Sequence, residues 1–423
     1  MLMLADAEVV LPDRVLNPGA VLIADGRIAG VEDGRPAHTG AEVVPLAGRR
    51  IVPGFVDAHV HGLLGRDVLE GPDALAWVAR AMPRFGVTAF APTAVACDPP
   101  TLRRLLDGVG TLRARTPVGA RVLPAHLESS FINPEYGGAQ PRSCLRLPPT
   151  FLPSGGPEWS RPRAGRSTGA SGKPFEADDI LAELDRRPAA VGVVTLAPEL
   201  PGALPLIGWL IDRRIQVSLG HSGASFEEGL AAIEAGARRA THLFNRMPPF
   251  HHRAPGLAGA LLQSARVAVE IIGDGYHLHP SIIRMVVETK QPSRTMAVTD
   301  GTAAAGMPAG SRARLGDQPL VVGPRAAQLE DGTLAGSTTT MDRVFGFLCD
   351  EVGLSTVDAA WLCATTPARR LGDDESGAIE PGKRADLAVL GPDGRVERTY
   401  VGGSLVFSVD SPEPRDGAID GTS

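Results

Sequence analysis

The sequence predicts an α/β protein whose main part is a (β/α)8 barrel, accompanied by a small sheet domain built from both ends of the chain. Apolar, strand-like runs alternate with helical stretches about eight times over about 320 residues, which is typical of parallel strands joined by helices. Short runs of alternating apolar and polar residues, separated by turn residues, begin the chain, and the same pattern returns near its end. With 423 residues, the chain is long enough for one large barrel and one accessory domain.

The accessory domain is predicted from hairpin signals at both ends. Asp25-Gly26 and Asp393-Gly394 each separate two alternating apolar runs, and this dipeptide favours a two-residue hairpin turn. We predict that residues 1–52 and 376–410 form this β-rich domain and that residues 53–375 form the barrel. Residues 142–175 are rich in Pro, Gly, Ser and Arg and predict a long surface loop. The polar residues 411–423 predict a disordered tail.

The barrel strands are predicted from apolar runs that each end in polar residues. Helices are expected between them, for example over residues 226–237 and 280–288. The apolar stretch 189–211 contains a glutamate and three prolines, so it predicts a buried strand followed by a helix and not a membrane span. In order, the runs are IVPGFVDAHVH, GVTAFAPTAV, RVLPAHLE, AVGVVTLAPE, QVSLGHSGA, RRATHLFN, VAVEIIGDG and RTMAVTDG.

Composition excludes several classes of partner. A net charge of −6, the absence of a basic stripe and an aromatic content of 4% argue against nucleic-acid binding. The N-terminus lacks a basic segment and turns acidic at Asp6 and Glu8, so it does not predict a signal peptide. The four cysteines are scattered and predict reduced thiols. We therefore expect a cytoplasmic protein with no membrane partner.

Histidines and carboxylates gather where the strand-like runs end, and barrel active sites lie at that edge. His59 and His61 share one face of an extended chain and could chelate a cation, although such pairs also occur by chance. Glu128 closes an apolar run, where a buried carboxylate needs a partner, either a metal or an arginine. His221 and His242 end two successive runs, although a lone histidine there would more often be a core residue.

These five side chains offer mixed nitrogen and oxygen ligands of the kind that suits zinc or another borderline divalent ion. They would suit two ions bridged by Glu128, or one tightly and one weakly bound ion. The chain has only three lysines, none at the end of a barrel-like run, so Glu128 is the candidate bridging ligand. His126 is expected to be structural, and Asp57 could equally be a ligand or a buried turn-stabilising carboxylate.

Asp300 ends the run TMAVTD and is the candidate proton-transfer group. A carboxylate beside a metal-bound water can take its proton and later deliver it to a leaving group. The alternative is that Asp300 caps a helix beginning at GTAAAG.

The motifs together resemble the amidohydrolase superfamily and, within it, the N-acetylglucosamine-6-phosphate deacetylase family. The resemblance implies a metal-dependent hydrolase barrel with a β-sandwich made from both termini, and hydrolysis of the N-acetyl group of an amino-sugar 6-phosphate. The matching strings run in order along most of the chain: PGFVDAHVHG, HLESSFINPEYGGAQ, VTLAPE, LGHSGAS, THLFNRMPPFHHRAPGLAGA, DGYHLHP, VTDGTAAAG, LAGS and GAIEPGKRADLAVL.

The resemblance also implies roles for particular residues. Glu128, His221 and His242 would hold the catalytic metal, His59 and His61 would hold a second ion, and Asp300 would be the general base and acid. The metal would be zinc, with iron, manganese or cobalt as alternatives, at one or two ions per subunit of a homodimer. The substrate-binding residues would be Arg253 and His252 at the phosphate, across a dimer interface, and His277, Asn245, Gln140, Ala335 and Gly336 at the sugar.

The chain departs from the family pattern at two places near the expected site. Ser129-Ser130 follow the metal-binding glutamate where a glycine and a proline are usual, and Gln140 replaces a substrate-facing histidine. A glutamine donates hydrogen bonds but shuttles no proton. Two alternatives remain: a different N-acyl amino sugar, such as N-acetylgalactosamine 6-phosphate or an unphosphorylated sugar, and a non-catalytic scaffold. A ring-opening amidohydrolase is disfavoured by the missing bridging lysine.

Overall fold

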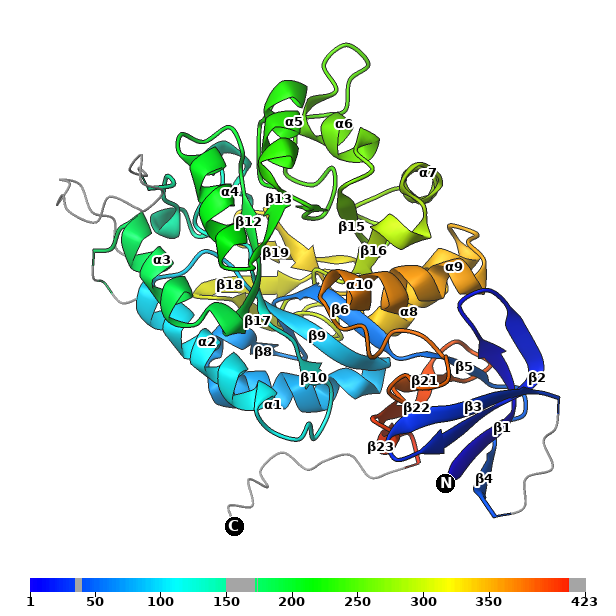
Figure 1. Ribbon diagram of the computed structural model, residues 1–423. Helices are drawn as coiled ribbons and strands as arrows, with labels where there is room; N and C mark the ends of the chain where they lie inside the picture. The colour runs from blue at the N-terminus through cyan, green and yellow to red at the C-terminus, as the bar shows by residue number, and fades with distance from the viewer. Residues whose placement is uncertain (35–39, 150–171, 173, 411–423) are drawn as a thin grey trace.

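The computed structural model describes residues 1–34, 40–149, 172 and 174–410 (Figure 1). The predicted tail, 411–423, and most of the predicted loop at 142–175 lie outside these residues. A barrel of parallel strands occupies the middle of the chain, and a separate β-rich domain carries both described ends.

Parallel strands at eight positions form a nearly closed barrel in the described part of the chain, one position being split into two short strands. Each of the eight apolar runs predicted from the sequence contributes to this barrel. The first and last strands close it: the Asp300 amide donates to the His59 carbonyl at 3.0 Å, and the His61 amide donates to the Gly301 carbonyl at 2.7 Å. The strands are β6 (Phe55–Val60), β9 (Val87–Ala94), β10 with β11 (Arg121–Val122, Ala125–Leu127), β12 (Val191–Leu196), β13 (Gln216–Leu219), β14 (Arg239–Ala240), β15 (Ala268–Ile272) and β16 (Thr295–Val298).

Helices cover the outside of the barrel (Figure 1). Helix α5 illustrates why they begin and end where they do: Ser225 and Glu228 form a reciprocal capping box at its start, and Gly236, at φ 122°, ends it. The helices are α1 (Pro72–Ala81), α2 (Pro99–Arg113), α3 (Ala177–Arg186), α4 (Ala203–Asp212), α5 (Phe226–Ala235), α6 (Gly256–Gln263), α7 (Pro280–Lys290), α8 (Met341–Asp350), α9 (Thr356–Ala360) and α10 (Thr366–Arg370).

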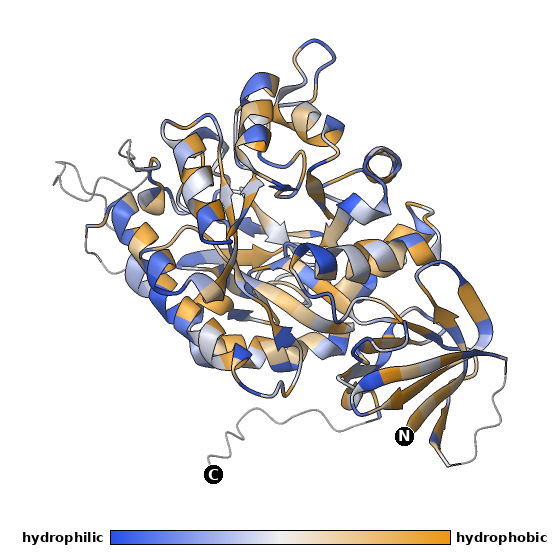
Figure 2. Ribbon diagram, viewed as in Figure 1, coloured by the Kyte–Doolittle hydropathy of each residue, from blue (hydrophilic) through white to orange (hydrophobic). Residues whose placement is uncertain are grey.

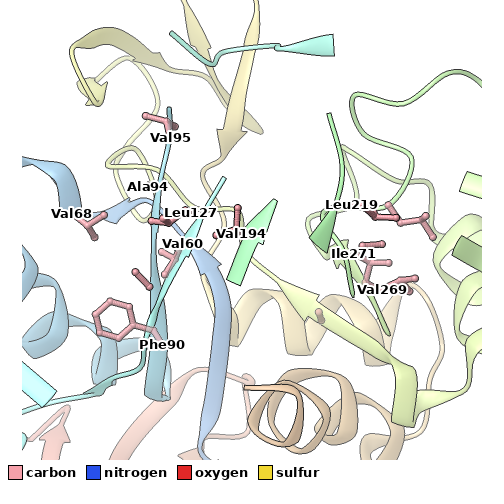
Figure 3. Packing of buried hydrophobic residues seen from close by; sticks show 14 of the residues in the cluster. Val60, Val68, Phe90, Ala94, Val95, Leu127, Val194, Leu219, Val269 and Ile271 are labelled. Atoms are coloured by element: carbon pink, nitrogen blue, oxygen red, sulfur yellow. The ribbon is translucent and has the colours of Figure 1, made fainter. Parts of the chain in front are cut away.

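The main hydrophobic core lies between these helices and the barrel strands. Phe90, Leu127 and Val194, from three neighbouring barrel strands, are buried within it (Figure 3). Figure 2 shows that the helices carry both hydrophobic and hydrophilic residues, as expected for elements with one buried face. Burial of apolar surface therefore holds the helical layer on the barrel.

The β-rich domain is one hydrogen-bonded sheet assembled from both ends of the chain. Asp25 and Gly26 both have positive φ, 49° and 75°, as the predicted two-residue hairpin turn requires. Leu4, Ile51 and Leu387 belong to its separate hydrophobic core. The predicted fold class is confirmed, whereas the predicted domain bounds stay a prediction. The strands are β1 (Leu2–Val10), β2 (Val15–Ala24), β3 (Arg27–Asp33), β4 (Glu42–Pro45), β5 (Arg50–Pro53), β21 (Leu387–Leu390), β22 (Val396–Val401) and β23 (Ser404–Ser408).

An antiparallel sheet that the sequence analysis did not predict is inserted after the last barrel strand. Its final strand pairs with the barrel rim through a parallel bridge between Ser337 and Gly301, so it contributes to the wall beside Asp300. Its strands are β17 (Arg312–Leu315), β18 (Gln318–Val322), β19 (Ala326–Leu329) and β20 (Leu334–Ser337), and a smaller hairpin consists of β7 (Gly62–Leu63) and β8 (Arg66–Asp67).

The apolar stretch 189–211 contains strand β12 and most of helix α4, as predicted. Among the described residues, no helix has both the length and the apolar character needed to cross a membrane.

An ion-pair network joins the barrel to the β-rich domain. Arg121, on β10, donates to Asp373 at 2.7 Å and to Asp386 at 2.8 Å, and it also contacts Ser376 at 3.0 Å. The side chain of Asp386 is fully buried, and that of Arg121 is only 15% exposed. The guanidinium is therefore the charge partner of two carboxylates at the junction.

We expect Arg121→Leu to lower the free energy of unfolding by roughly 3–5 kcal/mol, because two buried carboxylates lose the guanidinium nearest to them. Urea unfolding followed by circular dichroism would measure this. The control is Arg266→Leu, which removes an exposed pair with Glu234 and should cost less than ~1 kcal/mol. Equal losses in both variants would contradict the assignment.

Candidate metal centre

Six polar side chains meet at the carboxyl edge of the barrel. His59 lies in β6 and His61 directly follows it, while Glu128 directly follows β11. His221, His242 and Asp300 each lie two residues beyond a barrel strand. All six residues are buried, so the structure brings together the whole set that the sequence placed at strand ends.

The backbone turns sharply at three of these positions. His221, His242 and Asp300 have φ values of 48°, 28° and 47°, in the left-handed region that residues other than glycine rarely adopt. Such strain costs on the order of 1–3 kcal/mol per residue and persists only where surrounding structure enforces it. At each of these three residues, which lie just beyond a strand end, the turn directs the side chain into the mouth of the barrel.

Glu128, His221 and His242 form the tightest group. Glu128 Oε1 lies 2.8 Å from Nε2 of each histidine, and the two Nε2 atoms are 3.0 Å apart. The other ring nitrogen of His221, Nδ1, donates to the Tyr136 carbonyl at 2.9 Å. That carbonyl can only accept, so a neutral His221 carries its proton on Nδ1 and turns a lone pair toward Glu128.

This donor set fits a divalent ion. Ligands of a tetrahedral zinc with Zn–N of about 2.0–2.1 Å lie about 3.3 Å from one another, close to the separations seen here. Imidazole lone pairs and a carboxylate oxygen directed at one point repel each other unless a proton or a cation lies between them. His242 Nδ1 is buried and has no hydrogen-bond partner among the residues that the structure describes, so the ring is held from its Nε2 side.

His59 and His61 form a second group that shares Glu128. Their Nε2 atoms are 3.2 Å apart. Glu128 Oε1 lies 3.7 Å from His59 Nε2, and Oε2 lies 3.5 Å from His61 Nε2. His61 Nδ1 contacts the Thr93 carbonyl at 3.0 Å. As in His221, this leaves the lone pair on Nε2 available to a metal ion. Glu128 is partnered by imidazoles and by the side-chain amide of Gln140, and no arginine in the described part of the chain pairs with it.

Asp300 faces the second group. Its Oδ1 lies 3.4 Å from His59 Nε2 and 3.3 Å from His61 Nε2. Its backbone carbonyl accepts from the Ser337 amide at 2.9 Å, and Gly336 has φ 65° with no room for a Cβ, which would lie 2.5 Å from that carbonyl oxygen. The segment after it forms a turn and not a helix, so the helix-cap alternative does not apply.

The pKa shifts indicate that this cluster attracts positive charge. Burial alone would raise the pKa of Glu128, but His221 and His242 hold it well below its usual range. Burial likewise opposes the low pKa of Asp300, which His59 and His61 enforce. Burial would lower the pKa of His59, yet Asp300, Glu270 and Glu128 raise it to about 10. A site that protonates a fully buried imidazole in this way will also accept a cation.

A third group, made of His59, His126 and Glu270, is better explained as support for His59. Glu270 Oε2 lies 3.0 Å from His59 Nδ1, while its Oε1 accepts from the fully buried Arg239 at 2.7 Å. Arg239 already neutralises this carboxylate, which disfavours an ion there. Burial lowers the pKa of His126 to about 3, and its Nε2 contacts Thr195 at 2.8 Å, as expected of a structural residue.

Sequence reasoning missed Glu270 and Arg239. A signal was present for Glu270, because it is a charged residue in the otherwise apolar segment VAVEII, whereas Arg239 lies in the polar segment RRATHLFN and does not stand out. A carboxylate behind a metal-binding histidine fixes the tautomer and the orientation of its ring.

Asp57 has a structural role. Its Oδ2 accepts from the Thr299 hydroxyl at 2.6 Å, and its Oδ1 accepts from the His59 amide at 3.3 Å. Burial raises the pKa of Asp57 to about 6. The carboxyl group thus ties β6 to the segment after β16. Asp57 was predicted to be either a metal ligand or a buried turn-stabilising carboxylate, and the structure favours the second.

The predicted sugar-binding residues divide into a near and a far set. Near the cluster, Asn245 Nδ2 donates to the His242 carbonyl at 3.3 Å, and Ala335 and Gly336 belong to β20 beside Asp300. His277 Nδ1 contacts Asp274 Oδ2 at 2.7 Å, and although burial opposes it, Asp274 raises the pKa of His277.

Arg253 and His252 form the far set. Both are exposed on the segment between β14 and α6, which extends away from the barrel (Figure 1). The structure of one chain does not bring them to the cluster, and their role at a phosphate stays a prediction.

We expect His221→Ala and His242→Ala each to weaken binding of a divalent ion by more than the about 100-fold that follows loss of an outer-shell partner. Zn²⁺ titration of metal-free protein, followed by elemental analysis, would measure this. The matched control is His279→Ala, an exposed histidine at the start of α7. Unchanged metal content in the two cluster variants would contradict the site.

Comparisons with known proteins agree with this geometry. Residues 50–406 match the Amidohydrolase family. An N-acetylglucosamine-6-phosphate deacetylase of Vibrio furnissii is 34% identical over 420 residues, which covers 98% of this chain and 97% of the relative. An N-acetylgalactosamine-6-phosphate deacetylase of Escherichia coli O157:H7 is 32% identical over 396 residues, covering 92% and 95%.

The fold agrees as well. A mutant N-acetyl-D-glucosamine-6-phosphate deacetylase from Mycobacterium smegmatis, solved in complex with N-acetyl-D-glucosamine-6-phosphate, superimposes with a TM-score of 0.82. It is 31% identical and covers 96% of this chain and 99% of its own. The match extends over the barrel, the β-rich domain and the strand-end cluster, and the chain therefore belongs to the amidohydrolase family.

Proposed function

We propose that this chain is a metal-dependent hydrolase that removes the acetyl group from N-acetylglucosamine 6-phosphate, giving glucosamine 6-phosphate and acetate. The observation that carries the proposal is the buried cluster in which Glu128 joins His221 and His242, while Asp300, at the same edge of the barrel, faces His59 and His61. Full-length relatives named for this activity support the choice of substrate.

The same cluster supports zinc as the ion, held by Glu128, His221 and His242, with His59 and His61 as a second position. Nitrogen and carboxylate donors also suit iron, manganese or cobalt. When bound, a divalent ion supplies Lewis-acid chemistry, polarising the amide carbonyl and making a water nucleophilic near neutral pH.

Asp300 is proposed as the proton-transfer residue. Its low pKa keeps it a carboxylate at neutral pH, ready to accept a proton from the attacking water. The same proton then passes to the amide nitrogen as the C–N bond breaks, so the sugar leaves as a neutral amine. Water supplies one of the two oxygens of acetate, and the other is the former amide oxygen. The second proton of the water is released when the acetic acid ionises, and Asp300 is again a carboxylate.

We further propose a homodimer in the cytoplasm, in which Arg253 and His252 reach the 6-phosphate of a substrate bound by the partner subunit. An arginine matches phosphate oxygens with a planar fork of donors. The exposed position of both residues on one chain supports a role at an interface. His277, Asn245 and the Ala335-Gly336 backbone are proposed to line the sugar. Four free thiols suit a reducing compartment.

One alternative has support of its own. The relative named for N-acetylgalactosamine 6-phosphate is as similar in sequence as those named for the glucosamine compound. The two sugars differ only in configuration at C4, so the same metal cluster and base would serve either substrate.

A panel of N-acetylated sugars tests these alternatives through kcat/KM. We expect N-acetylglucosamine 6-phosphate to exceed its unphosphorylated form by at least about 100-fold, or about 2.7 kcal/mol of transition-state binding. Arg253→Ala should remove most of that difference while leaving the unphosphorylated sugar unaffected. Arg253 is not the phosphate ligand if the variant keeps full discrimination, and a preference for the galactosamine epimer would favour the alternative substrate.

Asp300→Asn should lower kcat by about 10²- to 10⁴-fold, because an amide cannot carry the proton. Metal content, measured on the same sample, should stay close to that of the unaltered protein. Asp331→Asn, at an exposed residue, is the matched control and should leave kcat unchanged. A variant that kept its kcat would exclude Asp300 from proton transfer.

A further inference from the structure

The side chain of Gln140 lies directly against Glu128, the carboxylate shared by both histidine pairs. Gln140 is only 5% exposed and follows the short 3-10 turn at Pro134–Tyr136 in the loop after β11. Its Nε2 donates a hydrogen bond to Glu128 Oε2. This contact was not expected from the sequence, which placed Gln140 at the substrate.

The orientation of the Gln140 amide follows from a second hydrogen bond. The Ala96 backbone amide donates to Gln140 Oε1 at 2.7 Å. A backbone N–H is only a donor, so the atom facing it must be the oxygen, and the NH₂ group must face Glu128. With the amide reversed, an N–H would oppose an N–H, and a carbonyl oxygen would oppose a carboxylate.

The loop that carries Gln140 is itself held in place. The backbone N–H of Gln140 donates to the Gly137 carbonyl at 3.0 Å. The side chain of Gln318, from β18, donates through Nε2 to the Ala139 carbonyl at 2.5 Å. Gln140 is thus held by hydrogen bonds at its backbone and at both the oxygen and the nitrogen of its side-chain amide.

The Glu128 carboxylate, held in this way, lies closer to one histidine pair than to the other. Its Oε1 lies 2.8 Å from both His221 and His242. Toward the other pair the separations are 3.7 Å for His59 and 3.5 Å for His61, and the oxygen facing His61 is the one that accepts from Gln140. A hydrogen bond to that oxygen occupies one lone pair and reduces the charge it can donate to a cation.

We propose that Gln140 is a positioning residue that makes the two metal positions unequal. It presents Glu128 Oε1 to His221 and His242, where one ion binds tightly, and it weakens a second ion at His59 and His61. This inference rests on the proposed function only in that the cluster holds a divalent ion, and it concerns binding and not turnover.

The test is a Zn²⁺ titration of the metal-free full chain by calorimetry, with a chelator as competitor, and a parallel Co²⁺ titration followed by absorption. The unaltered protein should bind one ion at least about 100-fold more tightly than the second. Gln140→Met keeps the length of the side chain but removes the donor, and it should tighten the second ion by about tenfold, or about 1.4 kcal/mol. The first ion should bind no more tightly than before.

Two further variants complete the design. Gln140→Glu keeps an acceptor for the Ala96 amide and replaces the donor by a carboxylate, so it should tighten the second ion at least as much as Gln140→Met. Gln216→Met is the matched control, because Gln216 donates to the Arg370 carbonyl away from the cluster and its loss should leave both affinities unchanged. A purely structural role for Gln140 would shift both ions together.

Equal affinity for two ions in the unaltered protein would overturn the inference. So would a second-ion affinity in Gln140→Met within twofold of the original. A protein that binds ions unequally but deacetylates no sugar would overturn the proposed function and leave this inference standing, whereas one that binds no divalent ion would overturn both.

Discussion

Closure of the barrel between its first and last strands is the constraint on which the site depends. The carboxyl ends of parallel strands lie along one edge of a sheet, and closing the sheet into a barrel brings the ends of its first and last strands together. Here the closure is made by backbone bonds from His61 to Gly301 and from Asp300 to His59, and by the Asp57 carboxyl on Thr299. The same bonds that complete the fold therefore place Asp300 beside His59 and His61.

Charge balance around the rim follows from this closure. Three carboxylates, Glu128, Asp300 and Glu270, lie within a few ångströms of four histidines in a buried environment, where unpaired charge is costly. Arg239 neutralises Glu270 alone. The remaining two carboxylates, together with Glu270, raise the pKa of His59, and a divalent ion satisfies the same demand for positive charge. Arg239 thus gives the carboxylates different roles. Glu270, which it neutralises, supports the His59 ring, whereas Glu128 and Asp300 remain available to a divalent ion and to the reaction.

Much of this arrangement was predictable because it is local. An apolar run followed by a histidine or a carboxylate identifies both a strand and the edge at which its last residue lies, and Asp25-Gly26 identifies a hairpin, since the turn needs two residues that tolerate positive φ. The inserted sheet β17–β20 was missed because its short strands gain their stability from pairing with each other and with the rim at Gly301. Its hairpins are local, since Leu315 pairs with Gln318, but the bridge at Gly301 joins residues distant in sequence, as does the contact of Arg121 with Asp386.

By itself the sequence determined which donor atoms this protein has and that they stand at strand ends, because strand periodicity and the polar residues that terminate each run are local properties. Only the tertiary structure decided which oxygen of Glu128 faces which pair of histidines, that Gln140 contacts this carboxylate, and that Arg239 lies behind Glu270. Those contacts span different strands and loops, and their distances depend on how the barrel closes and how its neighbouring strands are aligned. No local pattern contains that information.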